Sequence, residues 1–229
     1  MQAKPAPRIK VCGVTLTDDL NFLAAAGVDT IGLNFVPSSP RCISPTQGQQ
    51  LSSRAAELGL LRVAVVMNMP PTSLVDLLKQ VEVDFVQLHG SELPDMAAAC
   101  LGLPIIKATS WTGRTEEAQL IQAWRPLAKS GTLIAIIVDA YAPASGGGTG
   151  RTACWDLLQP RPADLADIPL ILAGGLNPDN VATAVSATTP HGVDTASGVE
   201  LRPGVKSEEL VQKFVKNLAG QWKVLQTEN

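Results

Sequence analysis

Short, continuous runs of apolar residues recur along the chain, as is typical of strands that are buried on both faces. Eight such runs predict eight strands, which cover residues 9–13, 30–36, 61–67, 84–89, 104–109, 133–140, 169–175 and 192–198. Most of them alternate with segments whose apolar residues recur every three or four positions, which predicts helices. These helical segments cover residues 17–27, 46–59, 72–81, 93–102, 115–128, 177–187 and 207–222.

About eight alternations of strand and helix with no linker-like break predict one domain over residues 1–229, a (β/α)8 TIM barrel of the α/β class. Residues 1–8 would form a lead-in and residues 221–229 a C-terminal tail. The sixth unit is the weakest, because residues 153–161 supply only a short helix. The alternative is an open doubly wound sheet. The barrel is favoured because polar or small residues end most strands, where a barrel gathers them at one mouth: Cys12, Asn34, His89, Lys107, Asp139, Gly174 and Asp194.

The amino-acid composition limits the kinds of partner that the chain can bind. The chain has 45% hydrophobic residues, 17% charged residues and a net charge of -3, so it offers no basic surface for nucleic acid. No apolar stretch approaches the length of a membrane span, and the N-terminus lacks the apolar run of a signal peptide, so we expect a cytoplasmic protein. The four cysteines are scattered without a CxxC pair, which argues against a metal site and against a disulfide framework.

Glycine-rich segments follow the last three predicted strands. Clustered main-chain N–H groups bind phosphate well where glycine lets the oxygens come close, and loops after strands seven and eight form the recurring phosphate site of this fold. The alternative for the first segment is a surface linker. A nucleotide P-loop is excluded, because Arg151 stands where that motif needs lysine. The candidate phosphate-binding residues are Gly147, Gly148, Thr149, Gly150, Gly174, Gly175, Ser197 and Gly198.

Two residues at strand ends are candidates for acid–base chemistry. Cys12 could be a buried filler or a base, and as a thiolate it would need nearby positive charge or N–H donors. We expect Lys10 to face away from it. Asp139 follows six apolar residues, and an unpaired buried carboxylate is costly, so it is either a catalytic acid or part of a cap or ion pair.

Three further residues are candidates for binding a substrate. Arg41 lies in a proline-punctuated loop, where its planar fork suits a carboxylate, although a solvated loop arginine is an equal alternative. Gln87 and His89 alternate along one strand and therefore point the same way, into or over the barrel. His89 is either structural or a proton carrier.

Taken together, these segments resemble the phosphoribosylanthranilate isomerase family of tryptophan biosynthesis, in its monofunctional form. The matching segments are KVCGVT, GLNFVPSSPRCIS, VQLHG, IVDA, GGGTGRT, LAGGLNPDNV and GVDTASGVE, in the family's order. The resemblance covers essentially the whole chain. Two departures are Leu33–Asn34, where the family usually has a bulky apolar or aromatic pair, and Thr195–Ala196, where a serine is expected. We expect the first to reshape the pocket and the second to remove a hydroxyl near the phosphate.

The resemblance implies a cofactor-free Amadori rearrangement of N-(5-phosphoribosyl)anthranilate to 1-(2-carboxyphenylamino)-1-deoxyribulose 5-phosphate. It implies Asp139 as the general acid and Cys12 as the general base. Arg41 would face the anthranilate, and Asp194 would lie near the substrate amine or hydroxyls. The glycine segments would hold the phosphate, and the chain would be a monomer or a homodimer. Another phosphosugar barrel isomerase, or a catalytically silent phosphate-binding barrel, are the competing interpretations.

Overall fold

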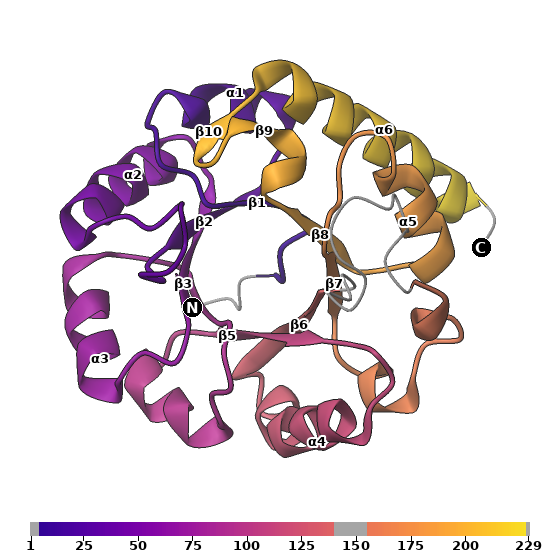
Figure 1. Cartoon of the computed structure of the whole chain (residues 1–229), viewed down its shortest axis with the longest axis horizontal. Coiled ribbons are helices and arrows are strands. Elements are labelled where there is room, and N and C mark those ends of the chain that lie inside the picture. Colours follow the sequence, from indigo (N-terminus) through magenta and orange to yellow (C-terminus); the bar gives the residue numbers. More distant parts are fainter. Residues whose placement is uncertain (1–4, 140–154, 228–229) are drawn as a thin grey trace.

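A computed structural model of the chain describes residues 5–139 and 155–227. Eight parallel strands form a closed barrel in sequence order, and helices surround it (Figure 1). The first and last strands pair directly, with Lys10 opposite Asp194, so the open-sheet alternative is excluded. The strands are β1 (Ile9–Cys12), β2 (Thr30–Asn34), β3 (Leu61–Val66), β4 (Phe85–Leu88), β5 (Ile105–Ser110), β6 (Leu133–Asp139), β7 (Leu170–Ala173) and β8 (Gly192–Thr195).

Most predicted helices are present. Ser44 caps the second helix by accepting the Gln47 N–H at 3.2 Å, and Pro45 takes the first position. The helices are α1 (Asp19–Ala26), α2 (Pro45–Glu57), α3 (Pro71–Gln80), α4 (Thr115–Lys129), α5 (Val181–Thr188) and α6 (Glu208–Thr227).

Three local predictions need correction. The segment predicted as a helix at 93–102 is a 3-10 helix (Pro94–Cys100), a form that short pieces commonly take. The last helix continues to Thr227, so most of the expected tail is helical. The predicted eighth strand ends early at Thr195, and Ser197–Val199 form a short 3-10 helix instead. The sixth unit is weak as expected, since its described part holds only the 3-10 helices Trp155–Leu158 and Ala163–Leu165.

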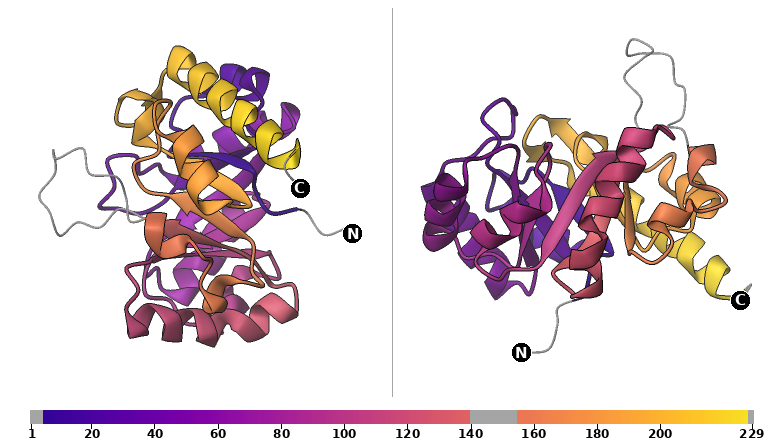
Figure 2. Two further views of the ribbon diagram at one scale, coloured as in Figure 1. Left: turned by 90° about the vertical axis from the view of Figure 1, so that its right-hand side faces the viewer. Right: turned by 90° about the horizontal axis from the view of Figure 1, so that it is seen from below.

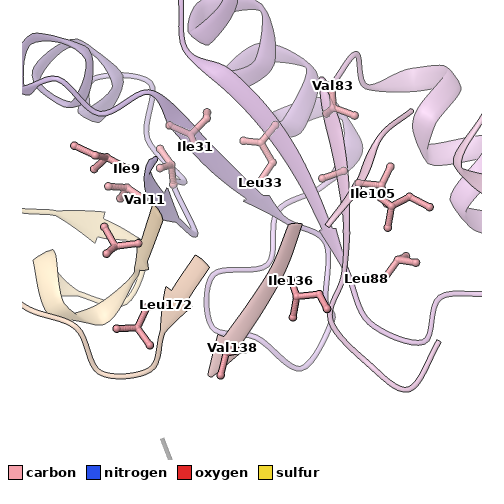
Figure 3. Packing of buried hydrophobic residues seen from close by; sticks show 14 of the residues in the cluster. Ile9, Val11, Ile31, Leu33, Val83, Leu88, Ile105, Ile136, Val138 and Leu172 are labelled. Carbon is pink, nitrogen blue, oxygen red and sulfur yellow. The ribbon is translucent and has the colours of Figure 1, made fainter. Parts of the chain in front are cut away.

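Apolar side chains form two clusters, one on each face of the barrel wall. The outward-facing cluster fills the layer between strands and helices, and includes Val11, Leu33 and Val138 (Figure 3). The inner cluster fills the barrel with Val63, Phe85, Ile106 and their neighbours, so the barrel is a packed core. Polar side chains that enter the barrel interior therefore pack against apolar side chains.

A two-stranded hairpin that the sequence analysis missed lies beside β1 (Figure 1). It consists of β9 (Glu200–Arg202) and β10 (Val205–Lys206), paired antiparallel. Side views place the hairpin on the face opposite the lead-in residues 5–8 (Figure 2). The hairpin thus lies at the carboxyl ends of the strands, the face on which barrels of this kind build their sites.

Candidate active site

Cys12 and Lys10 both enter the barrel interior from β1. Positions two apart in a strand share a face, so the expectation that Lys10 faces away is wrong. Gly32 of β2 leaves room for both, because a side-chain carbon there would lie 2.7 Å from Cys12 Sγ and 3.2 Å from Lys10 Nζ. The charge of Lys10 lowers the pKa of the Cys12 thiol. The thiol therefore has the positive neighbour that a thiolate needs.

Lys10 is fully buried and forms an ion pair with Asp194 of β8, with Nζ 3.0 Å from Oδ1. The pairing register of β1 and β8 places these two residues opposite each other. Burial would lower the pKa of Lys10, but Asp194 and Cys12 together outweigh it and raise the pKa above its ordinary value. The ion pair with Asp194 therefore favours the ammonium form of Lys10 inside the barrel.

The pKa of the Cys12 thiol reflects opposing influences. Burial raises it, Lys10 and Lys206 lower it, and Asp194 raises it again, which leaves it above the ordinary value. The Cys12 side chain is only partly buried at the end of its strand. The lysines thus offset part of the cost of forming a thiolate in this position.

Gln87 and His89 point the same way from the end of β4, as predicted. Gln87 Nε2 lies 2.7 Å from His89 Nδ1. Burial lowers the pKa of His89, Lys10 adds to that effect, and Asp194 and Asp139 oppose it. His89 is therefore neutral near pH 7, and it lies within electrostatic reach of both Asp139 and the Lys10–Asp194 pair.

Asp139 ends β6 and lines a cavity of about 610 Å³ at the barrel mouth. His89, Ser110 and Glu117 line the same cavity. Cys12, at the end of β1, is not among the residues that line this cavity. The described residues thus bring Asp139 and His89 together in one cavity, and His89 lies within electrostatic reach of the Lys10–Asp194 pair beside Cys12.

Arg41 lies on the other side of Cys12, in the loop after β2. Its Nε and Nη2 donate to Oε1 and Oε2 of Glu200 at 2.8 and 2.6 Å, so its fork is occupied by a carboxylate of the chain itself. Lys206 Nζ donates to Glu200 Oε1 at 2.7 Å and to the main-chain oxygen of Cys12 at 2.6 Å. The sequence analysis missed Glu200 and Lys206, because nothing in their local sequence marks them as partners of residues far along the chain.

The two sequence departures have structural roles. Leu33 faces outward into the layer between strands and helices and is fully buried, so the expectation that it reshapes the pocket is wrong. Asn34 organises the loop that carries Arg41, since its Oδ1 accepts the Val36 N–H at 2.8 Å and its Nδ2 donates to Ser39 Oγ at 3.3 Å. The Thr195 hydroxyl donates to the Leu176 main-chain oxygen at 2.7 Å.

The loops after β7 and β8 pack main chain against main chain. A side chain at Gly198 would collide with the main-chain oxygen of Leu176. Gly174 and Gly175 both adopt left-handed backbone conformations, with φ of 94° and 65°. Ser197 is exposed at the start of the short 3-10 helix that follows β8. The candidates Gly147, Gly148, Thr149 and Gly150 lie outside the described residues.

Two negative findings concern the described part of the chain. In residues 5–139 and 155–227, no group of three or more His, Cys, Asp or Glu side chains is placed to hold a metal ion. Over the same ranges, no helix has the length and apolar character that crossing a membrane requires.

Known proteins resemble the chain over nearly its full length. An N-(5'-phosphoribosyl)anthranilate isomerase from Myxococcus xanthus (strain DK1622) is 40% identical over 211 residues, which cover 91% of this chain and 94% of the relative. Two solved structures of the enzyme from Thermotoga maritima have TM-scores of 0.75 and 0.77 at 30% and 31% identity, and each comparison covers 94% of this chain and 100% of the other. One of them is described as monomers generated from a dimeric enzyme.

A further solved structure is a phosphoribosylanthranilate isomerase in complex with reduced 1-(o-carboxyphenylamino)-1-deoxyribulose 5-phosphate. It has a TM-score of 0.74 at 30% identity and covers 94% of this chain and 100% of that chain. The family model described as N-(5'phosphoribosyl)anthranilate (PRA) isomerase matches residues 9–217. These findings confirm the resemblance drawn from the motifs, and the chain belongs to the phosphoribosylanthranilate isomerase family of tryptophan biosynthesis.

Proposed function

We propose that this isomerase uses Cys12 as its general base and Asp139 as its general acid. Both residues end strands whose carboxyl ends open on one face of the barrel. The single observation that carries the proposal is that both side chains lie on the inner face of the barrel: Cys12 packs against the inner apolar cluster, and Asp139 lies two positions after Ile137 of that cluster and shares a cavity with His89. A substrate over His89 would lie between the sulfur and the carboxyl group.

The chemistry of an aldose-to-ketose shift matches these two groups. Asp139 protonates the ring oxygen of the phosphoribosyl group, and the ring opens to an imine. Cys12 then removes the proton from the adjacent sugar carbon, which gives an enolamine that tautomerises to the ketone. The atoms of the substrate are conserved, so one acid, one base and a fixed orientation are sufficient.

We assign the carboxylate of the anthranilate to Arg41. Its fork is formed and held by Glu200, and a substrate carboxylate takes the place of Glu200 when it binds. The displaced Glu200 stays near the site, because its Oε1 accepts hydrogen bonds from Lys206 Nζ and from the Gly204 N–H. Asp194 and Gln87 lie on the inner wall, where substrate hydroxyls reach them.

We assign the phosphate to the loops after β7 and β8 and to residues 147–150. Gly174, Gly175, Ser197 and Gly198 support this assignment, because their loops present main chain without bulky side chains. Gly147, Gly148, Thr149 and Gly150 complete the proposed site from the segment after β6. The T. maritima relative is described as dimeric, so we expect this chain to be either a monomer or a homodimer. We place the protein in the cytoplasm, together with its substrate.

Incubation of the purified protein with freshly made N-(5-phosphoribosyl)anthranilate tests the function. We expect substrate fluorescence to disappear while a product of unchanged mass accumulates, because the reaction is an isomerisation. With a different phosphosugar isomerase or a silent barrel, the fluorescence would fall only at the uncatalysed rate. That result would contradict the proposal.

A further inference from the structure

Lys10 has no place in the acid–base steps assigned to Cys12 and Asp139, yet it is a fully buried cation in the barrel interior. A buried charge is costly unless it is paired, and a lysine retained there needs a reason. Its ion pair with Asp194 places Nζ 3.0 Å from a carboxylate oxygen. The ammonium group also lies beside the sulfur of Cys12. A Cβ atom added at Gly32 would lie 3.2 Å from Lys10 Nζ and 2.7 Å from Cys12 Sγ.

We propose that Lys10 is a positioning residue, whose ammonium group is paired with Asp194, lies beside Cys12 and stabilises the thiolate form of that side chain. The proposal rests on the proposed role of Cys12 as the base. Lys10 does not touch the substrate. It acts through the sulfur, and Asp194 acts on the sulfur in the opposite sense through its own negative charge.

The charges around Cys12 support this role. Three cations influence the thiol or respond to it, namely Lys10 of β1, Lys206 of β10 and Arg41 of the loop after β2. Two carboxylates, Asp194 and Glu200, are paired with these cations. Among the described residues the group therefore carries one positive charge in excess while Cys12 is a neutral thiol, and becomes neutral when the thiol ionises.

Lys10 is the cation with the most direct access to the sulfur. Lys206 directs its ammonium group to the main-chain oxygen of Cys12 and to Glu200, and Arg41 is engaged by both oxygens of Glu200. Lys10 is the one of the three whose charged nitrogen borders, together with the Cys12 sulfur, the space that Gly32 leaves open. Loss of Lys10 would leave burial and Asp194 to oppose ionisation, and Lys206 as the main remaining influence in its favour.

The rate at which iodoacetamide alkylates Cys12, measured against pH without substrate, tests the proposal. The thiolate is the reacting form, so the midpoint of the rate profile reports its pKa, and the plateau at high pH reports access to the sulfur. Mass spectrometry of the Cys12 peptide isolates this thiol from the others. Cys42 and Cys154 are replaced by serine, and burial raises the pKa of Cys100 to about 12, which keeps it unreactive.

Three variants give distinct outcomes. We expect Lys10→Met to slow alkylation at about pH 8 roughly tenfold, because loss of one neighbouring positive charge shifts the thiol equilibrium by about that factor. We expect Asp194→Asn to accelerate it several-fold at the same pH, with the midpoint moved to lower pH. Lys107→Met is the matched control, since Lys107 is another buried lysine paired with a carboxylate, Glu92, at 3.2 Å, and we expect it to leave the Cys12 profile unchanged.

Opposite shifts for the two members of one ion pair support the proposal, because simple loosening of the barrel would move both variants the same way. An unchanged midpoint in Lys10→Met, or a shift of both variants in one direction, would overturn it. If Lys10→Met fails to fold, Asp194→Asn decides, and a midpoint that stays or rises contradicts the proposal. Since no substrate is present, failure of the proposed isomerase function would appear separately, as absent turnover in the wild-type protein.

Discussion

Arg41 and Glu200, 159 positions apart in the chain, face each other through a two-point ion pair with distances of 2.8 and 2.6 Å. The pair joins the loop after β2 to the hairpin after β8, directly beside Cys12. It holds the guanidinium fork on a carboxylate by two parallel hydrogen bonds, the geometry from which we propose that Arg41 binds the anthranilate carboxylate.

Arg41→Ala should raise KM about tenfold to a hundredfold and change kcat little. The reason is that a hydrogen bond to a charged group contributes about 1.5–3 kcal/mol to binding. Steady-state kinetics with N-(5-phosphoribosyl)anthranilate checks this. Arg54→Ala is the control, since Arg54 pairs with Glu57 at the surface and far from the site, and should keep the wild-type KM. A wild-type KM in Arg41→Ala would exclude the proposed contact.

Gly32→Ala should reduce kcat by about one to two orders of magnitude, because displacement of a catalytic group by about 1 Å can cost a hundredfold. The new methyl group would lie 2.7 Å from Cys12 Sγ, so the sulfur or Lys10 must move. Gly220→Ala is the matched control. Gly220 lies in α6 with no neighbour within 4 Å of an added carbon, and its substitution should leave kcat unchanged while it stabilises the helix slightly. Equal kcat values in the two variants would contradict the prediction.

Gly198→Ala should raise KM more than it lowers kcat. An added side chain would meet the main-chain oxygen of Leu176 and separate the loops to which we assign the phosphate. We expect an increase in KM of about tenfold or more, comparable to the loss of one or two hydrogen bonds. Kinetics with the same substrate measures it, and a change in kcat alone would show that these loops do not hold the phosphate.

The stability of the protein at acid pH should depend on Glu200. Burial would raise the pKa of this carboxyl, but hydrogen bonds from Arg41, Lys206 and the Gly204 N–H outweigh it, so its pKa lies below the ordinary value of 4.5. Because the pKa is lower in the folded state, the stabilisation is fully present above pH 4.5 and is lost as the pH falls through the folded value.

Glu200→Gln should therefore lower the free energy of unfolding by about 3 kcal/mol near neutral pH, because two cations lose their carboxylate. Denaturant unfolding of both proteins between neutral pH and about pH 3 measures the difference. We expect it to shrink as the pH falls. A difference that stays constant, or grows towards acid pH, would show that ionisation of Glu200 is not its source.

The barrel itself could be predicted from sequence because local signals repeat in every unit. Each strand is a continuous apolar run and each helix has its own periodicity, so errors in single elements, such as the 3-10 helix Pro94–Cys100, do not alter the architecture. The placement of Gln87 and His89 on one face followed from strand alternation alone, and it is confirmed.

The partners of the site residues could not be predicted, because they are distant in sequence. Lys10 and Asp194 meet only when β1 and β8 close the barrel. Glu200 and Lys206 lie on a hairpin whose sequence has no strong local pattern, and it brings them to Arg41 and Cys12. Lys10 was the exception, since its position two residues before Cys12 places both on one strand face. The correct alternation would have identified it.

The most direct test of the central assignment is the turnover of Cys12→Ala and Asp139→Asn, measured by the loss of substrate fluorescence. A positioned acid or base contributes about a hundredfold or more to rate, so each variant should lose at least that factor in kcat with little change in KM. Cys42→Ser, which removes an exposed thiol, should match the wild type. If Cys12→Ala retains near-normal turnover, the base is a different residue, with Asp194 as the next candidate, and the assignment of Cys12 as the base is contradicted.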